Sequence, residues 1–211
     1  MCLAARPATS AKLRGVMRPR VILASSSPRR REILSALGLT FETRPSDVDE
    51  SLKDGEGAFA AAERLACAKA SAVAAGEPDA LVVAADTLVV LDGEALGKPK
   101  GRADARRTLS RLAGRAHDVV TAVALARGGR VVSGREITRV TFAPMTEREV
   151  DAYVASGEPD DRAGSYAIQG IGGLFVERVE GSPSNVVGLP VRLLYTLAKD
   201  FGVDLGVNLR P

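Results

Sequence analysis

Apolar runs and segments of helical periodicity alternate along most of the chain, and serine, glycine or charged residues separate them. The first apolar run, residues 21–24, stops at three serines. Pro28 then begins a helix that is expected to end at Gly38, because proline suits the first helical position and glycine often follows the last one. A long alanine-rich helix is predicted over about 57–75, with Leu65 on its buried face.

The middle of the chain contains the most strongly apolar segment. Residues 80–85 are continuously apolar, as expected of an interior strand. Asp86 and Thr87 are expected to interrupt this strand, and residues 88–91 to continue in extended form. Asp92-Gly93 is then a strong signal for a two-residue hairpin.

The remaining pattern mixes helices and strands, without an internal repeat or a clear linker. Strands are expected at 39–44, 117–126, 130–142, 166–168 and 174–179, and helices at 103–113, from a Thr146/Glu149 capping box to 156, and from Pro190 onward. Strands and helices that alternate in this way define the α/β class with a mixed sheet. One domain over residues 19–211 accommodates all of them.

Composition narrows the class of protein further. The chain is 45% apolar and 26% charged, as in ordinary globular proteins, and no apolar run approaches the roughly 20 residues of a membrane span. Cys2 and Cys67 lie in the tail and in a predicted helix, so neither a disulfide framework nor a metal cluster is expected. Because no apolar run is long enough to span a membrane, a membrane partner is not expected.

The net charge of +3 comes from the first residues of the chain. Residues 1–18 contain no acid and four basic residues, Arg6, Lys12, Arg14 and Arg18. Subtracting these four charges from the total leaves about −1 for the rest, which argues against a broad nucleic-acid-binding face. The segment lacks the apolar stretch of a secretory signal and superficially resembles an organellar transit peptide; we expect a disordered leader, or a translation start at Met17.

The three serines and the arginines that follow them are candidates for binding a polyphosphate. A helix N-terminus presents unpaired N–H groups and the positive end of its dipole, Ser27 adds a donor, and arginine forks match phosphate oxygens. Arg29, Arg30 and Arg31 point about 100° apart on a helix, so they cannot all face one ligand. A capped surface helix with solvated arginines is the alternative interpretation of this segment.

Acids and lysines are the other candidates for chemistry. The single histidine, His117, begins a predicted strand and is expected to be structural. Asp86, Glu50, Lys69 and Lys98 lie at element ends or near a buried helix face, where they could hold a divalent cation and a triphosphate while one carboxylate activates water. Oxygen ligands favour Mg²⁺ or Mn²⁺ over zinc. Solvated side chains or local ion pairs are the alternative for each residue taken alone.

A glycine-rich segment, residues 164–173, is the third candidate region. Its glycines allow close backbone approach to a ligand, and Gln169 offers both a donor and an acceptor for a base edge. As a pattern alone this signal is weak, because glycine-rich hairpins are common.

Taken together, these segments resemble the Maf family of nucleoside triphosphate pyrophosphatases. Five motifs occur in the family's order within about residues 20–200: Leu-Ala-Ser-Ser-Ser-Pro-Arg-Arg at 23–30, Ala-Asp-Thr at 85–87, Gly-Lys-Pro at 97–99, Gly-Ser-Tyr-Ala-Ile-Gln-Gly at 164–170 and Ser-Asn-Val-Val-Gly-Leu-Pro at 184–190. The resemblance implies hydrolysis of a nucleoside triphosphate between the α and β phosphates, a divalent metal and a cytoplasmic homodimer. It also implies an elongated mixed sheet with two lobes around a cleft, similar to inosine triphosphatases.

The resemblance also implies roles for particular residues. Asp86 matches the family's proposed general base, and with Glu50 it would hold the metal. Lys69 and Lys98 match other charged positions of the family's active site. Positions that match residues tied to substrate choice or to the phosphates are Ser27, Arg29, Arg30, Thr87 and Gln169.

The Ile-Gln-Gly form of the fourth motif is similar to the branch that acts on dTTP and UTP. We therefore expect a pyrophosphatase for dTTP, UTP and modified pyrimidine triphosphates. Under this hypothesis Arg29 faces the base, Arg30 faces phosphate and Arg31 is solvated. The alternatives are a 7-methyl-GTP or purine triphosphate pyrophosphatase with the same fold, and a non-enzymatic nucleotide-binding regulator of septum formation.

Overall fold

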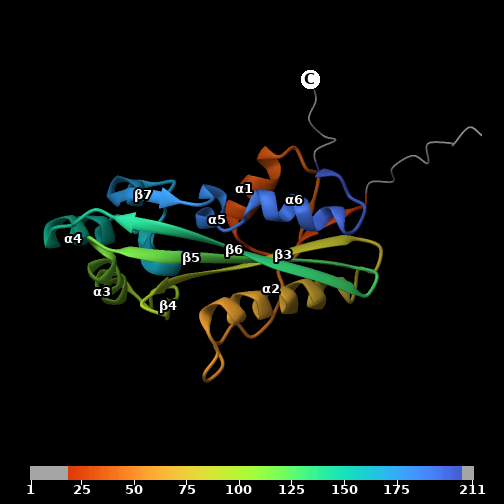
Figure 1. Ribbon diagram of the computed structural model, residues 1–211, viewed down its shortest axis with the longest axis horizontal. Coiled ribbons are helices and arrows are strands. Elements are labelled where there is room, and N and C mark those ends of the chain that lie inside the picture. Colours follow the sequence, from red (N-terminus) through yellow and green to blue (C-terminus); the bar gives the residue numbers. More distant parts are fainter. Residues whose placement is uncertain (1–18, 206–211) are drawn as a thin grey trace, which may run out of the picture.

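A computed structural model describes residues 19–205 and contains a twisted mixed sheet with helices on both faces (Figure 1). Within this part of the chain the sheet has seven strands, ordered β2-β1-β3-β5-β6-β7, with β4 paired to β3. The strands are β1 (Val21–Leu23), β2 (Glu42–Thr43), β3 (Leu81–Leu91), β4 (Glu94–Leu96), β5 (Ala116–Arg127), β6 (Arg130–Phe142) and β7 (Val176–Glu180). β1 is parallel to both β2 and β3, and the other pairs are antiparallel.

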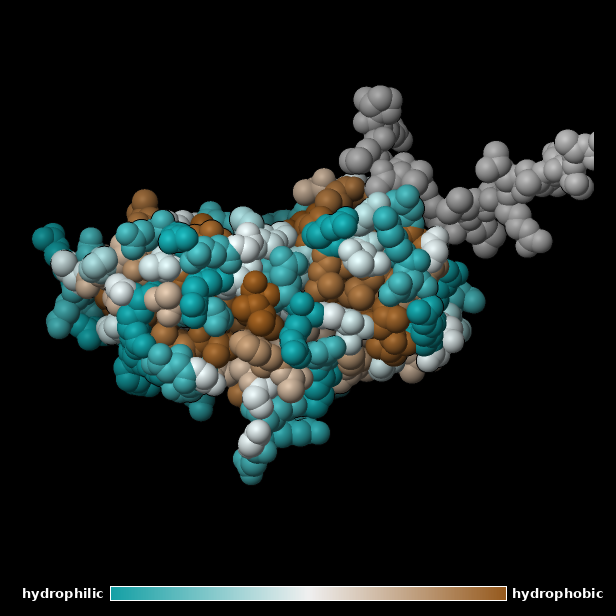
Figure 2. Space-filling model, viewed as in Figure 1, coloured by the Kyte–Doolittle hydropathy of each residue, from teal (hydrophilic) through white to brown (hydrophobic). Residues whose placement is uncertain are grey.

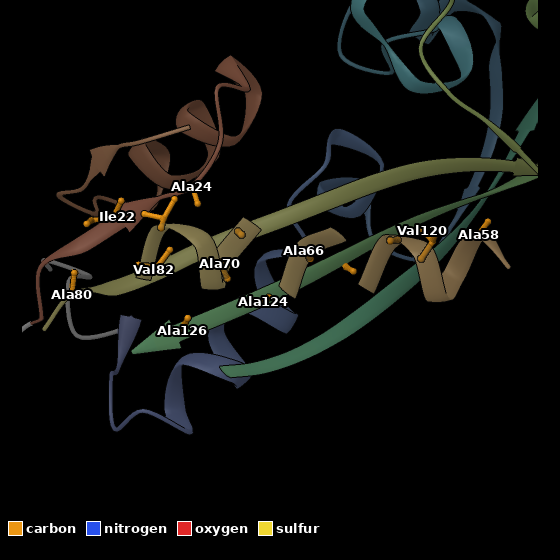
Figure 3. Packing of buried hydrophobic residues seen from close by; sticks show 14 of the residues in the cluster. Ile22, Ala24, Ala58, Ala66, Ala70, Ala80, Val82, Val120, Ala124 and Ala126 are labelled. Atoms are coloured by element: carbon orange, nitrogen blue, oxygen red, sulfur yellow. The ribbon is translucent and has the colours of Figure 1, made fainter. Parts of the chain in front are cut away.

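One face of the sheet is covered by α2 (Ala58–Ala74), as Figure 3 shows. Five of the eight buried residues of this helix are alanine, and Ala66 and Ala70 pack with strand residues such as Val82 and Ala124. Small side chains on both surfaces let the helix backbone approach the sheet closely. The α2 helix is therefore held tightly over the centre of β3 and β5.

The opposite face carries α1 (Pro28–Ala36), α5 (Pro183–Val187) and α6 (Val191–Lys199) (Figure 1). Leucines of α1 and α6 pack here against the alternate residues of the same strands, including Val83. This alternation follows from the two-residue period of a strand. On the face seen in Figure 2, apolar residues gather between α6 and the sheet, with hydrophilic residues around them.

The far end of the long strands carries a second group of helices. These are α3 (Arg102–Leu112), α4 (Glu147–Ala155) and the short 3₁₀ helices η1 (Glu158–Asp161), η2 (Ala163–Ser165) and η3 (Ile171–Phe175). Their apolar side chains form a separate core around Phe142 and Tyr153. β3, β5 and β6, at 11, 12 and 13 residues, extend from the part of the sheet covered by α1, α2 and α6 to this separate core. They therefore join two lobes, one around each of these two parts of the sheet.

Several local predictions are confirmed. The turn between β3 and β4 has φ of 53° at Asp92 and 81° at Gly93, as a two-residue hairpin requires. Both reciprocal hydrogen bonds of the Thr146/Glu149 capping box are present. His117 is a buried core residue, and the α/β class with an elongated mixed sheet is correct.

Other predictions are wrong or incomplete. β3 is not interrupted at Asp86 and Thr87, which pair with Ala122 and Thr121 of β5 in an unbroken ladder. The second strand is only two residues long, and α5 was not predicted. Residues 166–168 are not a strand, because the glycine-rich segment folds into the 3₁₀ turns η2 and η3.

The predictions on the leader, the cysteines and membrane spans have different outcomes. The predicted disordered leader 1–18, with Met17 and Cys2, lies outside the described residues, so these remain predictions. Cys67 is half-buried on α2. No helix in residues 19–205 is both long and apolar enough to cross a membrane.

Candidate active site

A cleft of about 420 Å³ lies between the two lobes and is lined by segments far apart in the sequence. Its walls come from the start of α1, the loop at 45–52, the middle of β3, the turn after β4, residues 161–169 and the end of α5. All nine residues predicted for the site line this cleft: Ser27, Arg29, Arg30, Glu50, Lys69, Asp86, Thr87, Lys98 and Gln169. The structure therefore brings together every residue selected from the sequence.

Lys69 and Asp86 form a buried ion pair at the bottom of the cleft. Lys69 lies one turn after Leu65 on the inward side of α2, and its Nζ is 2.7 Å from Asp86 Oδ1. The two side chains are only 7% and 9% exposed. Burial raises the pKa of Asp86, and the Lys69 ammonium opposes that effect. A carboxylate with a raised pKa is better suited to accept a proton near neutral pH.

Glu50 completes this group from the other wall. Its Oε1 lies 2.8 Å from the same Lys69 Nζ, although its side chain is 59% exposed. Glu50 and Asp86 therefore converge on one point, one from a solvent-facing loop and one from an interior strand. Lys69 neutralises part of the charge that the two acids create.

The donor chemistry of Glu50 and Asp86 fits Mg²⁺ or Mn²⁺. Both offer hard carboxylate oxygens, and Mg²⁺ is commonly bound through one or two carboxylates together with substrate phosphates and water. Among the described residues, no group of three or more acidic, histidine or cysteine side chains could enclose a metal by itself.

Arg30 supplies a positive charge fixed by the protein around it. Its Nε donates to the Gly188 carbonyl at 2.8 Å, and its two terminal nitrogens donate to Ser25 Oγ and Thr87 Oγ1, each at 3.1 Å. These three acceptors are all uncharged, and no acid lies within 4.0 Å in the described chain. A rigid guanidinium without a counter-ion is a suitable partner for a phosphate.

The start of α1 lies beside Arg30. The Ser27 hydroxyl forms no capping hydrogen bond, so the helix N-terminus is not closed by its own side chain. Arg29 is half-buried and lines the cleft, whereas Arg31 is exposed, as expected. The first turn of α1 thus forms part of the cleft wall, and its ability to bind an anion stays a prediction.

Thr87 contacts protein groups in a way that the sequence did not predict. Its Oγ1 accepts from Arg30 and lies 2.9 Å from Thr121 Oγ1. Thr87 thus helps to orient Arg30, and its role in substrate choice stays a prediction.

Asn185, which lies in the fifth motif but was not selected as a site residue, organises the residues behind Arg30. This fully buried side chain donates to the Val119 carbonyl and to Thr138 Oγ1, both at 2.9 Å, and accepts from the Thr121 N–H at 3.1 Å. It thereby fastens α5 to β5 and β6. The Ser-Pro pair at 182–183, a typical helix start, was the local signal for this element.

The opposite wall carries Lys98, Gln169 and Arg162. Lys98 Nζ pairs with Asp161 Oδ1 at 2.7 Å, with both side chains mostly exposed. Gln169 is exposed and forms no side-chain hydrogen bond within the described residues. Arg162 was also missed by the sequence reasoning; its Nη1 is buried and lacks a hydrogen-bond partner among the described residues.

His117 takes no part in the cleft. Its Nε2 lies 2.9 Å from the Tyr166 hydroxyl, and its ring packs edge-on against Phe142 and Tyr166. Burial lowers the pKa of His117 to about 4, so the ring is neutral at physiological pH. The histidine belongs to the core below the glycine-rich segment.

The cleft beside this mixed sheet holds the buried Lys69–Asp86 pair together with Glu50, Lys98 and Arg30, which has no acidic partner among the described residues. These features define an α/β protein whose cleft suits a charged ligand. Residues 20–201 match the Maf-like protein family, and the chain belongs to that family. It is 48% identical to the dTTP/UTP pyrophosphatase of Chromobacterium violaceum over 191 residues, which are 88% of this chain and 96% of that protein. It is 50% identical to the dTTP/UTP pyrophosphatase of Anaeromyxobacter dehalogenans over 194 residues, 90% and 97% of the two chains.

A solved structure supports the fold. The Ham1 protein of Staphylococcus aureus superposes with a TM-score of 0.53 over 86% of this chain and 99% of that chain, at 15% sequence identity. The elongated mixed sheet with flanking helices is therefore an architecture shared with Ham1.

Proposed function

We propose that the protein hydrolyses nucleoside triphosphates, dTTP and UTP in particular, to the monophosphate and pyrophosphate. The observation that carries this proposal is the convergence of Glu50, Lys69 and Asp86 on one point of a cleft whose other walls supply cations. Phosphoryl chemistry depends mainly on positioning and on neutralising charge, which such a cleft provides. The names of the relatives reported above supply the nucleotide class.

In the proposed mechanism the start of α1 and Arg30 bind phosphate oxygens, and Lys69 and Lys98 neutralise charge as the bond breaks. Asp86 accepts the proton of the attacking water, whose oxygen forms a bond to the α phosphorus. The anhydride bond between the α and β phosphates breaks, and its electron pair leaves with pyrophosphate. A Mg²⁺ or Mn²⁺ ion held by Glu50 and Asp86 would supply Lewis-acid stabilisation of the phosphates. Gln169 reads the base from the opposite wall.

The main test replaces Asp86. With dTTP, Mg²⁺ and pyrophosphate detection, Asp86→Asn is expected to lower kcat by about 100-fold or more, because proton transfer to a positioned base contributes at least that factor. Asp118→Asn is the matched control, since Asp118 lies on β5, pairs with Arg139 and does not line the cleft. Near wild-type turnover of Asp86→Asn would show that Asp86 is not the base.

The pH profile gives an independent check of the same assignment. The base must be ionised, so activity is present above its pKa and is lost as pH falls through it. Because burial raises the pKa of Asp86, the acid limb of kcat/KM should lie above 3.8, the ordinary aspartate value. An acid limb at or below that value would contradict the assignment.

A nucleotide panel separates the alternatives. Preference for dTTP and UTP over dGTP and 7-methyl-GTP supports the proposed base class, and the reverse preference favours the purine alternative. Triphosphate binding without metal-stimulated hydrolysis would favour the non-enzymatic regulator. We also propose that the protein acts as a cytoplasmic homodimer. Size-exclusion chromatography with light scattering tests the oligomeric state.

A further inference from the structure

Glu158, at the start of η1, holds the segment that carries Gln169. Its Oε1 accepts from the Gly172 N–H at 2.9 Å, and its Oε2 accepts from the Ile171 N–H at 3.0 Å. The same Oε1 accepts from the Tyr153 hydroxyl at 2.7 Å. One carboxylate therefore binds two consecutive amides on the C-terminal side of Gln169.

Tyr153 holds the N-terminal side of the same residue. This tyrosine is only 2% exposed on α4, and its hydroxyl accepts from the Ala167 N–H at 3.1 Å while donating to Glu158. The anchors thus lie two residues before Gln169 and two and three residues after it. Gln169 itself is left without an anchor of its own in the described chain and faces the cleft.

The glycines of this segment fit closely around the two anchors. A Cβ at Gly170 would overlap the Glu158 carboxylate, and a Cβ at Gly172 would overlap the Tyr153 hydroxyl. Neither glycine has positive φ, so contact with the two side chains explains their presence better than backbone strain does. The glycine-rich sequence and the Glu158–Tyr153 pair are therefore parts of one arrangement.

The charge of Glu158 also suits this role. Burial disfavours its ionised form, but the hydrogen bonds from Gly172, Tyr153 and Ile171 outweigh burial and hold the pKa of Glu158 below its ordinary value. No basic side chain lies within 4.0 Å of this carboxylate in the described residues, so backbone amides and one hydroxyl take the place of a counter-ion. Both carboxylate oxygens of Glu158 are thus engaged in hydrogen bonds to this segment and to Tyr153, so we do not assign this residue to the chemistry in the cleft.

We infer that Glu158, together with Tyr153, is a positioning residue that fixes Gln169 against the nucleotide base and so sets the discrimination between pyrimidine and purine triphosphates. The inference rests on the proposed function, because it assigns base reading to Gln169. A glutamine held in one place rejects a base with the wrong edge, because the bound base would cover the polar groups of the glutamine and leave them unpaired. A glutamine on a loosened segment would adapt to either base.

Two variants test the anchoring without reference to activity. Glu158→Gln replaces one acceptor oxygen with an NH₂ donor, which cannot accept from Ile171 N–H, and Tyr153→Phe removes the hydroxyl that holds Ala167. Hydrogen exchange of peptides spanning 167–173 should be at least tenfold faster in both variants, with thermal melting as a check on folding. Glu147→Gln is the matched control, since Glu147 is a highly exposed acid on α4 outside the cleft. Unchanged exchange in both variants would overturn the inference.

The specificity test uses a double-mutant cycle. Glu158→Gln is expected to lower the dTTP/dGTP ratio of kcat/KM about tenfold, the typical effect of one misplaced polar contact. In a Gln169→Ala background the same change should alter the ratio less than twofold, because the residue being positioned is gone. An equal loss in both backgrounds would show a merely structural role.

Failure of the proposed function has a separate signature. If the wild-type protein hydrolyses no triphosphate, the function is wrong, and the cycle is then measured on dTTP and dGTP dissociation constants by calorimetry. Non-additive loss of the binding ratio would still support the positioning role, and additive loss would overturn it.

Discussion

Replacing Asn185 with alanine would test the network that fastens α5 to the sheet behind the cleft. The Asn185 side chain is fully buried and forms three hydrogen bonds, to Val119, Thr138 and Thr121. Alanine can form none of them. Thr138 Oγ1 keeps its two contacts with Ser182, so the loss is concentrated on Asn185 and β5.

The size of the effect follows from the number of bonds. A buried hydrogen bond contributes about 1 kcal/mol net, so loss of three is expected to lower the free energy of unfolding by about 3 kcal/mol. The position of Gly188 at the end of α5 should also change, and its carbonyl is one of the three acceptors that orient Arg30. Triphosphate affinity is therefore expected to fall together with stability.

Urea unfolding of the wild-type protein and of Asn185→Ala measures the first effect, and the stabilisation of each protein by added dTTP measures the second. Thr196→Ala is the control, because Thr196 is exposed and bonds only within α6; its change should stay within about 0.5 kcal/mol. A loss below about 1 kcal/mol for Asn185→Ala would refute the view that this network holds α5 in place.

Two further predictions concern stability at other positions. Gly164 and Gly55 have similar φ of 69° and 73°, but a Cβ at Gly164 would come within 2.8 Å of the Val89 side chain, whereas Gly55 has open space. Gly164→Ala should therefore lower the free energy of unfolding, measured in urea, by at least about 1 kcal/mol more than Gly55→Ala does. Equal losses would contradict this packing argument. Because burial lowers the pKa of His117 from 6.5 to about 4, the unfolded state binds more protons in that window, and the free energy of unfolding should fall by about 2 kcal/mol from pH 8 to pH 5. His117→Leu should remove that part of the pH dependence, and an unchanged profile would show that His117 does not titrate in this way.

The sequence predicted elements well where the cause is local. The Asp92-Gly93 turn requires residues that tolerate positive φ, and the Thr146/Glu149 capping box needs two side chains three residues apart. These causes act within a few residues, so they are visible in the chain itself. The helices at 28–37, 57–75 and 103–113 were found for the same reason.

The errors in the fold have causes that are distant in sequence. A charged residue in an apolar run usually ends a buried strand, but Asp86 stays inside β3 because Lys69, 17 residues earlier, neutralises it. Residues 166–168 were expected to be a strand, and they are instead part of a turn organised around the Glu158 carboxylate. Neither partner can be identified from the local pattern.

The sequence located the candidate residues of the cleft more completely than the elements around them, and the roles of these residues stay predictions. Periodicity placed Lys69 near the buried face of its helix, and all nine residues selected as candidates line the cleft. Asn185, Arg162 and Glu158 were missed because their roles depend on contacts between separate elements. Charged residues at the ends of predicted elements are easier to select from sequence than residues that connect separate elements.

The distribution of charge explains how a chain that is nearly neutral after residue 18 can select a polyanion. Eight charged side chains line the cleft, namely the five basic residues Arg29, Arg30, Lys69, Lys98 and Arg162 and the three acids Glu50, Asp86 and Asp161. Their formal sum is about +2, although the chain after residue 18 carries about −1 in total. A triphosphate with one divalent cation carries about −2, so the cleft and this ligand neutralise one another. Positive charge concentrated in one cleft attracts a compact polyanion, whereas a long nucleic acid would need an extended basic face.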